Sequence, residues 1–287
     1  MKITIVSGKG GTGKTTIATN LAKLINNAFY VDMDVEEPNG RLFLKPEIVN
    51  EENYNVMIPE INEDKCNYCG LCANNCAFNA LSIIKSINNA LFFEDLCHHC
   101  GVCSYVCPEN AIKEVDKCIG KINYGKFDSK NINFIEGVLN LNEATGTPII
   151  NGISRLLNEE KVYVLDAPPG TNCPVVSAIN SADFIILAIE PTPFGVHDGE
   201  LTLEIIKGTN KPCGVVINKY SNENLDRFIN NNELNILGKI PFKRGIAERY
   251  SKGDLLIDMN GDLRNAFIAI IKNINKLNSR EIRWKEQ

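Results

Sequence analysis

The ten residues from Ser7 to Thr16, SGKGGTGKTT, constrain this chain more than any other stretch. They follow an apolar run, Ile3 to Val6, and open a helical pattern. The stretch matches G-x-x-x-x-G-K-[ST] at Gly8, Gly13, Lys14 and Thr15. Glycines let a backbone wrap closely around a polyphosphate, so that N–H groups and the positive end of the following helix face the anion. The stretch therefore predicts a strand, a phosphate-binding loop and a helix.

The polar residues of this loop have distinct predicted roles. Lys14 would reach the β- and γ-phosphates, and Thr15 would place its hydroxyl on Mg²⁺. ATP or ADP with Mg²⁺ is the expected ligand. The residues expected to contact it are Gly8, Lys9, Gly10, Gly11, Thr12, Gly13, Lys14, Thr15 and Thr16.

Acidic side chains follow two further apolar runs. FYVDMD, Phe29 to Asp34, ends in Asp32 and Asp34, and VYVLD ends in Asp166 before a Pro-Pro-Gly turn. Because the carboxyl ends of parallel strands meet at one edge of a sheet, these acids should lie beside the phosphate loop. Asp32 and Asp166 are predicted to bind Mg²⁺ directly or through water.

The remaining pattern alternates strands with helices. Strands are expected at 184–190, 214–218 and 236–240, and helices at 15–25, 148–157, 196–207 and 263–277, with strands or a hairpin in 118–136. This order predicts an α/β fold with a doubly wound, mostly parallel sheet. Asn218, at a strand end, could read a base edge through its amide, or could simply form a turn.

A cysteine-rich segment repeats itself at an offset of 31 residues, as EDKCNYCGLCANNCAFNAL and FEDLCHHCGVCSYVCPENAI. The spacing C-x2-C-x2-C-x3-C-P is that of a bacterial ferredoxin with two clusters, although Ala77 replaces the first proline. In that pattern the fourth cysteine of each run binds the other cluster. One predicted [4Fe–4S] centre then has Cys66, Cys69, Cys72 and Cys107, and the second has Cys97, Cys100, Cys103 and Cys76.

Zinc is the competing interpretation, since four thiolates also form a tetrahedral site, but zinc sites normally place two C-x2-C pairs well apart. His98 and His99 are interpreted as exposed loop residues because the cysteine count is complete without them. Eleven cysteines without a signal peptide favour metal binding over disulfides.

Composition narrows the expected partners. The net charge is −5 and no Lys/Arg cluster stands out, so nucleic acid is not expected as the main partner. The N-terminus enters a strand at once, and no apolar run reaches the roughly 18 residues that span a bilayer. We therefore expect a cytoplasmic protein without a transmembrane segment.

Together, KGGTGKTT, VDMDVEEPN, LDAPPGT, EPTPFG and VINK resemble the deviant Walker A ATPases of the MinD/ParA group. The resemblance implies a MinD-like P-loop ATPase domain in 1–59 and 113–287, interrupted by a small α+β ferredoxin domain in 60–112. It also implies a homodimer bridged by ATP, in which Lys9 reaches the partner's nucleotide. Asp34 would activate the attacking water, and Asn218 would contact adenine.

Three functions are consistent with these features. The leading one is a slow, dimer-dependent ATPase that couples its nucleotide state to electron transfer through the clusters to a protein partner. The first alternative is an ATPase that assembles or carries iron–sulfur clusters or another metallocofactor. The second is a positioning or regulatory ATPase that senses redox state. Cys173, near the Pro-Pro-Gly turn, is either a bridging or redox ligand or a plain thiol.

Overall fold

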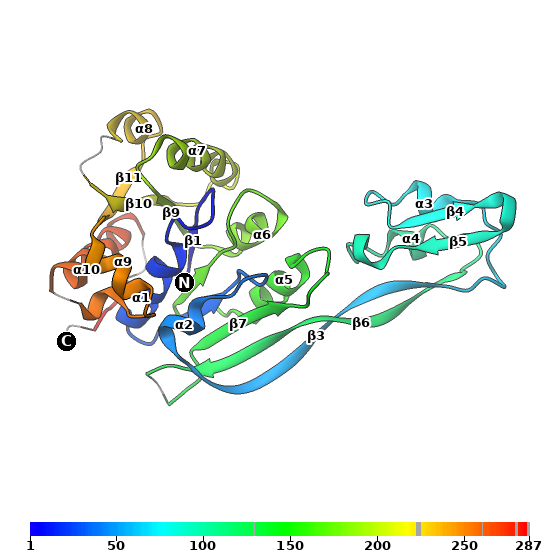
Figure 1. Cartoon of the computed structure of the whole chain (residues 1–287), viewed down its shortest axis with the longest axis horizontal. Coiled ribbons are helices and arrows are strands. Elements are labelled where there is room, and N and C mark those ends of the chain that lie inside the picture. Colours follow the sequence, from blue (N-terminus) through cyan, green and yellow to red (C-terminus); the bar gives the residue numbers. More distant parts are fainter. Residues whose placement is uncertain (129, 222–224, 260, 279–280, 286–287) are drawn as a thin grey trace.

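A nine-stranded sheet forms the centre of the computed structural model, which describes residues 1–128, 130–221, 225–259, 261–278 and 281–285 (Figure 1). Its order is β11-β10-β9-β1-β8-β2-β7-β6-β3, and the seven strands from β11 to β7 are mutually parallel. The strands run β1 (Lys2–Val6), β2 (Phe29–Asp32), β3 (Glu47–Ile61), β6 (Ile112–Lys126), β7 (Phe134–Leu139), β8 (Tyr163–Asp166), β9 (Phe184–Ile189), β10 (Cys213–Tyr220) and β11 (Asn235–Pro241).

Helices cover both faces of this sheet, as the continuous apolar strands require. One face packs against α1 (Lys14–Leu24) and α10 (Gly261–Leu277). The other packs against α5 (Thr147–Leu156), α6 (Cys173–Ser181), α7 (Pro193–Lys207) and α8 (Asp226–Asn231). Two shorter helices, α2 (Gly40–Leu44) and α9 (Arg244–Tyr250), complete this body. The predicted doubly wound, mostly parallel α/β fold is confirmed.

A long two-stranded ribbon leaves this body. β3 and β6 pair antiparallel from Glu47 with Lys126 to Ile61 with Ile112, but β6 pairs with β7 only over Gly120–Gly125. The outer part of the ribbon therefore runs past the sheet for about 25 Å, at roughly 3.3 Å per residue. Because β3 runs parallel to β7, the ribbon projects from the carboxyl edge, where the phosphate loop lies (Figure 1).

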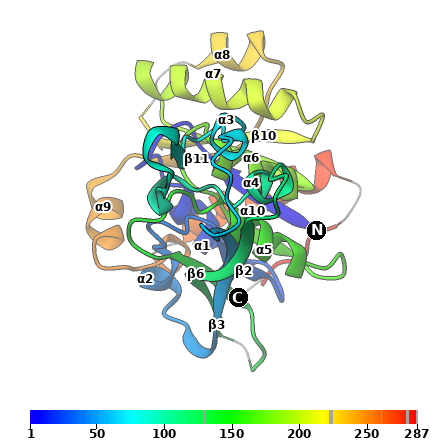
Figure 2. The ribbon, with the colours of Figure 1, turned by 90° about the vertical axis from the view of Figure 1, so that its right-hand side faces the viewer.

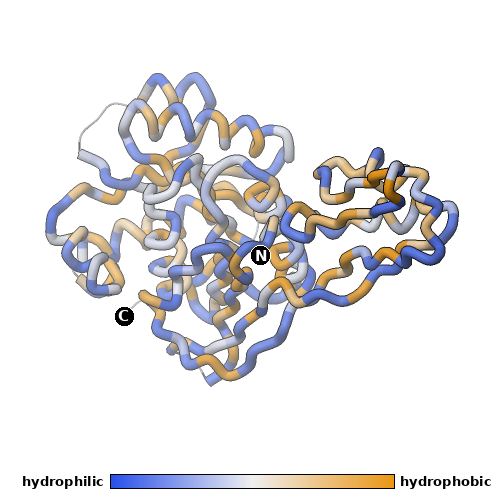
Figure 3. Tube along the Cα trace, turned by 45° about the vertical axis from the view of Figure 1, so that its right-hand side comes forward, coloured by the Kyte–Doolittle hydropathy of each residue, from blue (hydrophilic) through white to orange (hydrophobic). Residues whose placement is uncertain are grey.

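The tip of the ribbon carries residues 62–111, which we call the cysteine module. It contains α3 (Leu71–Asn74), the hairpin of β4 (Leu81–Ile84) and β5 (Asn89–Phe92), α4 (Val102–Tyr105) and the 3-10 turns η1 (Lys85–Ile87) and η2 (Glu94–Leu96). Its small core is formed by Cys72 and Leu81 together with Ile112, the first residue of β6. Figure 3 shows apolar residues gathered in the body and again at this tip, and Figure 2 shows α3 and α4 in front of the body when viewed from the module's side.

The sequence repeat is also a structural repeat. Gly70 and Gly101 both have positive φ, and so do Tyr68 and His99, each two residues after the first cysteine of a run. The backbone N–H of Phe93 donates to the Ala80 carbonyl, as that of Asn62 does to the equivalent Ala111 carbonyl. The two halves thus have the same local fold, and these two equivalent hydrogen bonds join them.

Candidate nucleotide and cysteine sites

The loop between β1 and α1 has the conformation that a phosphate cradle needs. Gly11 and Gly13 have φ of 74° and 101°, which a side chain would strain. A Cβ on Gly10 or Gly11 would meet no protein atom within 4 Å, whereas one on Gly8 would collide with the backbone of Asp198 in α7. The loop therefore leaves room for an anion on one side and is fixed by α7 on the other.

The two acids predicted on the magnesium side lie on adjacent strands. Asp32 of β2 and Asp166 of β8 are register partners, both buried, with the Tyr30 hydroxyl 3.1 Å from Asp32 Oδ2 and 2.9 Å from Asp166 Oδ2. The Gly40 N–H also donates to Asp32 Oδ2 at 2.9 Å. Asp166 Oδ1 is buried without a hydrogen-bond partner. An orphaned carboxylate oxygen beside the P-loop suits Mg²⁺ or its water shell.

The electrostatics of this edge favour a cation. Burial, reinforced by Asp166, raises the pKa of Asp32 well above its usual range, and burial raises the pKa of Asp166 against the opposing charge of Lys14. Burial and the Asp166 charge raise the pKa of the half-buried Asp34 to about 7, again opposed by Lys14. A bound Mg²⁺ would relieve this repulsion among carboxylates.

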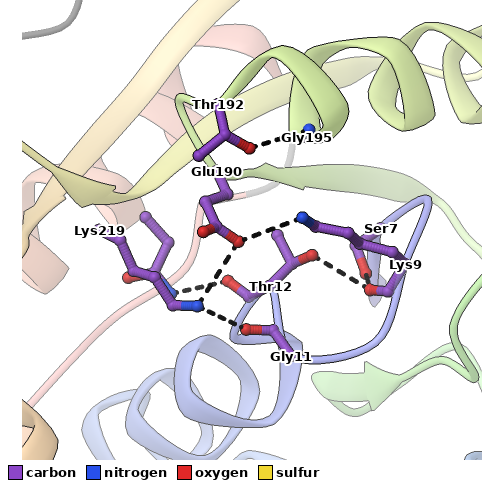
Figure 4. A network of polar contacts seen from close by, with 9 residues as sticks. Ser7, Lys9, Gly11, Thr12, Glu190, Thr192, Gly195 and Lys219 are labelled. Atoms are coloured by element: carbon purple, nitrogen blue, oxygen red, sulfur yellow. Dashed lines mark hydrogen bonds and ion pairs between the residues drawn. The ribbon is translucent and has the colours of Figure 1, made fainter.

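Lys9 and Asn218 both make polar contacts within the chain, and Figure 4 shows Lys9 beside Glu190. The Lys9 ammonium lies 3.6 Å from Glu190 Oε2 at the end of β9, and the Lys219 ammonium lies 3.5 Å from the same oxygen. Lys219 also donates to the Gly11 carbonyl at 3.0 Å, and Asn218 Nδ2 donates to the Thr12 carbonyl at 2.7 Å. Glu190 thus holds the Lys9 side chain within the chain, and Asn218 donates a hydrogen bond to the loop. Contact of Asn218 with adenine stays a prediction.

Two cavities lie in the cysteine module, and each gathers four cysteines from both repeats. The first is lined by Cys66, Cys69, Cys72 and Cys107. The second is lined by Cys76, Cys97, Cys100 and Cys103. These are the two crossed sets that the spacing predicts.

Backbone hydrogen bonds and burial both act on the sulfurs that line these cavities. Backbone N–H groups donate to four of them, from Tyr68 to Cys66, Ala80 to Cys76, His99 to Cys97 and Ala111 to Cys107, at 3.3–3.5 Å. Burial raises the pKa of the Cys72 and Cys97 thiols, and that of Cys103 to about 11. Without metal these thiols are protonated at neutral pH. Across the described residues, no three His, Cys, Asp or Glu side chains approach closely enough to hold a single metal ion.

Comparisons with known proteins identify the family of the whole chain. Residues 3–257 match the model of the CobQ/CobB/MinD/ParA nucleotide binding domain. The chain belongs to this family.

Similar proteins align over nearly the whole chain. Two uncharacterized proteins of Methanocaldococcus jannaschii are similar: MJ0579 is 33% identical over 286 residues, covering 95% of this chain and 97% of that protein, and MJ0578 is 32% identical over 283 residues, covering 96% and 97%. The septum site-determining protein MinD of Pyrococcus horikoshii, solved with Mg-ADP, has a TM-score of 0.59 at 19% identity and covers 96% of each chain. The chain is therefore a nucleotide-binding, MinD/ParA-like P-loop ATPase.

The nucleotide edge contains a second buried polar group that the sequence did not predict. Glu136 of β7 is the register partner of Asp32 and is fully buried. Arg41 Nε of α2 donates to Glu136 Oε2 at 2.8 Å, and Asn123 Nδ2 of β6 donates to Glu136 Oε1 at 2.9 Å. Only the pairing of β2 with β7 and of β7 with β6 brings these residues together, and no local motif signals it.

The sequence also raised His98, His99 and Cys173 as residues of interest near the predicted sites. The prediction that His98 and His99 are exposed is wrong: both are half-buried, His98 stacks on Phe78 with ring centroids 3.6 Å apart, and neither ring nitrogen of His99 reaches solvent. Both histidines line the second cavity. Cys173, at the start of α6, is exposed. Within the described ranges, no helix is both long and apolar enough to cross a membrane.

Proposed function

We propose that this MinD/ParA-like ATPase couples its nucleotide state to electron transfer through two [4Fe–4S] clusters held by the cysteine module, and passes electrons to a protein partner. The observation that carries this proposal is the pair of cavities, each lined by one crossed set of four cysteines. A bound [4Fe–4S] cluster supplies one-electron transfer.

The donor set supports clusters over single zinc ions. Each cavity is lined by three cysteines of one C-x2-C-x2-C run and by the fourth cysteine of the other run. This crossing is the ligand pattern of a two-cluster ferredoxin, whereas zinc sites normally place two C-x2-C pairs well apart. The N–H donors to sulfur would also tune a cluster's potential.

At the nucleotide edge the chain's own residues have complementary tasks. Lys14 and Thr15 would hold the phosphates and Mg²⁺, and Asp32 and Asp166 would bind the metal directly or through water. Asp34, whose pKa of about 7 suits a base at neutral pH, orients and activates water. Lys9 leaves Glu190 to reach the nucleotide of a second copy, so that ATP bridges a homodimer. Residues 60–112 form the inserted ferredoxin domain of this arrangement.

The experiment measures electron delivery. Anaerobically purified, reduced protein is mixed with an artificial one-electron acceptor in the presence of MgATP, MgADP or no nucleotide, after its iron content has been determined. We expect the rate of electron transfer to the acceptor to differ at least about fivefold between MgATP and MgADP. A fivefold change corresponds to a coupling free energy of about 1 kcal/mol, the low end of the usual range. Equal rates in the three states would contradict the proposal.

A second candidate function has an observation of its own. Cys69 and Cys100, one in each set, are exposed, which would let an acceptor protein attack the cluster. In that case the chain carries clusters, and ATP controls their release. Transfer of labelled iron to an apo-ferredoxin during nucleotide cycling would support the carrier, whereas iron retained through many turnovers supports the electron-transfer proposal.

A further inference from the structure

A chain of contacts joins the loop that carries Asp34 to the cysteine module. It begins at Val35, which is 2% exposed and whose carbonyl accepts the Leu139 N–H at 2.8 Å. A Cβ on Gly137 or Gly146 would collide with the Val35 side chain, so these glycines form the hollow in which Val35 sits. The Asp34–Val35 loop is therefore packed directly against the end of β7 and against the loop 140–146 that follows it.

The loop 140–146 is in turn attached to the ribbon by hydrogen bonds and an ion pair. The Asn140 N–H donates to the Ile119 carbonyl at 2.9 Å, and its side-chain amide donates to the Cys118 carbonyl at 3.0 Å. Glu143 Oε2 accepts from the Lys117 ammonium at 2.8 Å. These contacts attach the loop to three successive residues of β6, at the point where the ribbon leaves the sheet.

The Lys117 ammonium that contacts Glu143 also contacts the cysteine module. Its Nζ lies 2.7 Å from Glu94 Oε1, and Glu94 accepts the Cys97 N–H through its own carbonyl at 2.9 Å. The Lys117 and Glu143 side chains are only 16% and 8% exposed, so this pair is shielded from salt and water more than a surface ion pair. Lys117 thus lies between an acid of the body and an acid beside the second cysteine set.

We propose that Lys117 is a positioning residue that transmits the nucleotide-dependent position of the Asp34–Val35 loop to the second cysteine set. The inference rests on the proposed coupling of nucleotide state to the module and names the route. The loop moves β7, β7 moves Glu143, and the shared ammonium moves Glu94 and the backbone of Cys97. Each step is a contact within one packed network, and such networks carry energetic coupling when their elements have two arrangements.

The test uses hydrogen exchange of the full chain, which reports on position and does not depend on activity. Wild-type protein, Lys117→Met, Lys117→Arg and Glu143→Gln are compared with MgADP and with a non-hydrolysable MgATP analogue. Lys121→Met is the matched control, because Lys121 is also on β6 and also pairs with a glutamate, Glu51 at 2.5 Å, but contacts neither the loop nor the module through that pair.

We expect wild-type amides in 94–118 to exchange at rates that differ at least about fivefold between the two nucleotides. Lys117→Met and Glu143→Gln should lose that difference, with nucleotide affinity changed less than about twofold, while Lys117→Arg and Lys121→Met should keep it. A full difference in Lys117→Met would overturn the inference and leave the proposed function standing. Loss of protection in the nucleotide-free module of Lys117→Met would also overturn it, since Lys117 would then hold the fold of the module. No difference in wild-type protein would contradict both.

Discussion

The nucleotide edge and the cysteine module are assembled in opposite ways. At the edge, the side chains come from the loop after β1 and from the ends of β2, β8, β9 and β10, and only the parallel sheet brings them together. In the module, all eight cysteines lie within residues 66–107, and a duplicated local turn sets their positions. Function at the edge therefore depends on the global fold, whereas the module's chemistry is encoded over short distances.

The same contrast appears in their charges. The edge buries Asp32, Asp166 and Glu136, and the charges of Lys14 and Arg41 oppose those of Asp166 and Glu136. The module presents thiols whose pKa is raised by burial, so that they are neutral at pH 7. The two regions should consequently fail independently when mutated, apart from the coupling between them.

The largest effect should come from the two lysines of the loop. Lys9→Ala should lower the turnover number about 10³-fold, as loss of a group supplied in trans to phosphoryl transfer does, with nucleotide affinity of the monomer nearly unchanged. Lys14→Ala should weaken nucleotide affinity itself about 10–100-fold through loss of charged hydrogen bonds. Turnover and equilibrium binding are measured separately. Equal losses of binding in the two variants would contradict a role for Lys9 across a dimer.

The next effect separates the module from the edge. Cys107→Ser and Cys69→Ser should each remove the same cluster, halving the bound iron and abolishing the same EPR signal, because the two cysteines line one cavity. MgATP binding should be unaffected in both. Cys118→Ser, outside both cavities, is the matched control. If Cys107→Ser instead removed the signal that Cys100→Ser removes, the crossed ligand sets would be wrong.

A smaller effect concerns the stability of the body. Arg41→Ala leaves Glu136 buried without its ion pair, and we expect a loss of about 3 kcal/mol in the free energy of unfolding. Lys121→Ala breaks an exposed pair on the neighbouring ribbon and should cost less than about 1 kcal/mol. Urea denaturation of both variants measures the difference. Similar costs would mean that Glu136 does not need Arg41.

The smallest effect is a pH dependence of the edge. With a pKa of about 7, Asp34 is protonated below neutral pH, so kcat/KM for ATP should fall about tenfold per pH unit below 6.

The native state holds this proton more tightly than the unfolded chain, whose Asp pKa is about 3.9. Asp34 therefore lowers stability as pH rises from about 4 to 7. Asp34→Asn should remove that decline in urea midpoints, and an unchanged decline would exclude Asp34 as its source.

Sequence patterns predicted the two regions to different extents. The P-loop, Asp32 and Asp166 follow strand-end motifs, and the cysteine sets follow spacing, so both sites could be proposed without a structure. β3 could not, because its mostly exposed sequence, EIVNEENYNVMIPEI, lacks the alternation of a strand that packs on a core. Glu136 and Glu143 depend on which strands are neighbours and on their register, information that no single segment contains.

Midpoint potentials of the two clusters, measured by anaerobic redox titration with EPR in MgATP, MgADP and nucleotide-free protein, test the central claim most directly. The account predicts a shift of at least about 40 mV between MgATP and MgADP in the cluster held by Cys97, whose backbone N–H donates to the Glu94 carbonyl. This shift corresponds to a coupling free energy of about 1 kcal/mol. Identical potentials in all three states would contradict it.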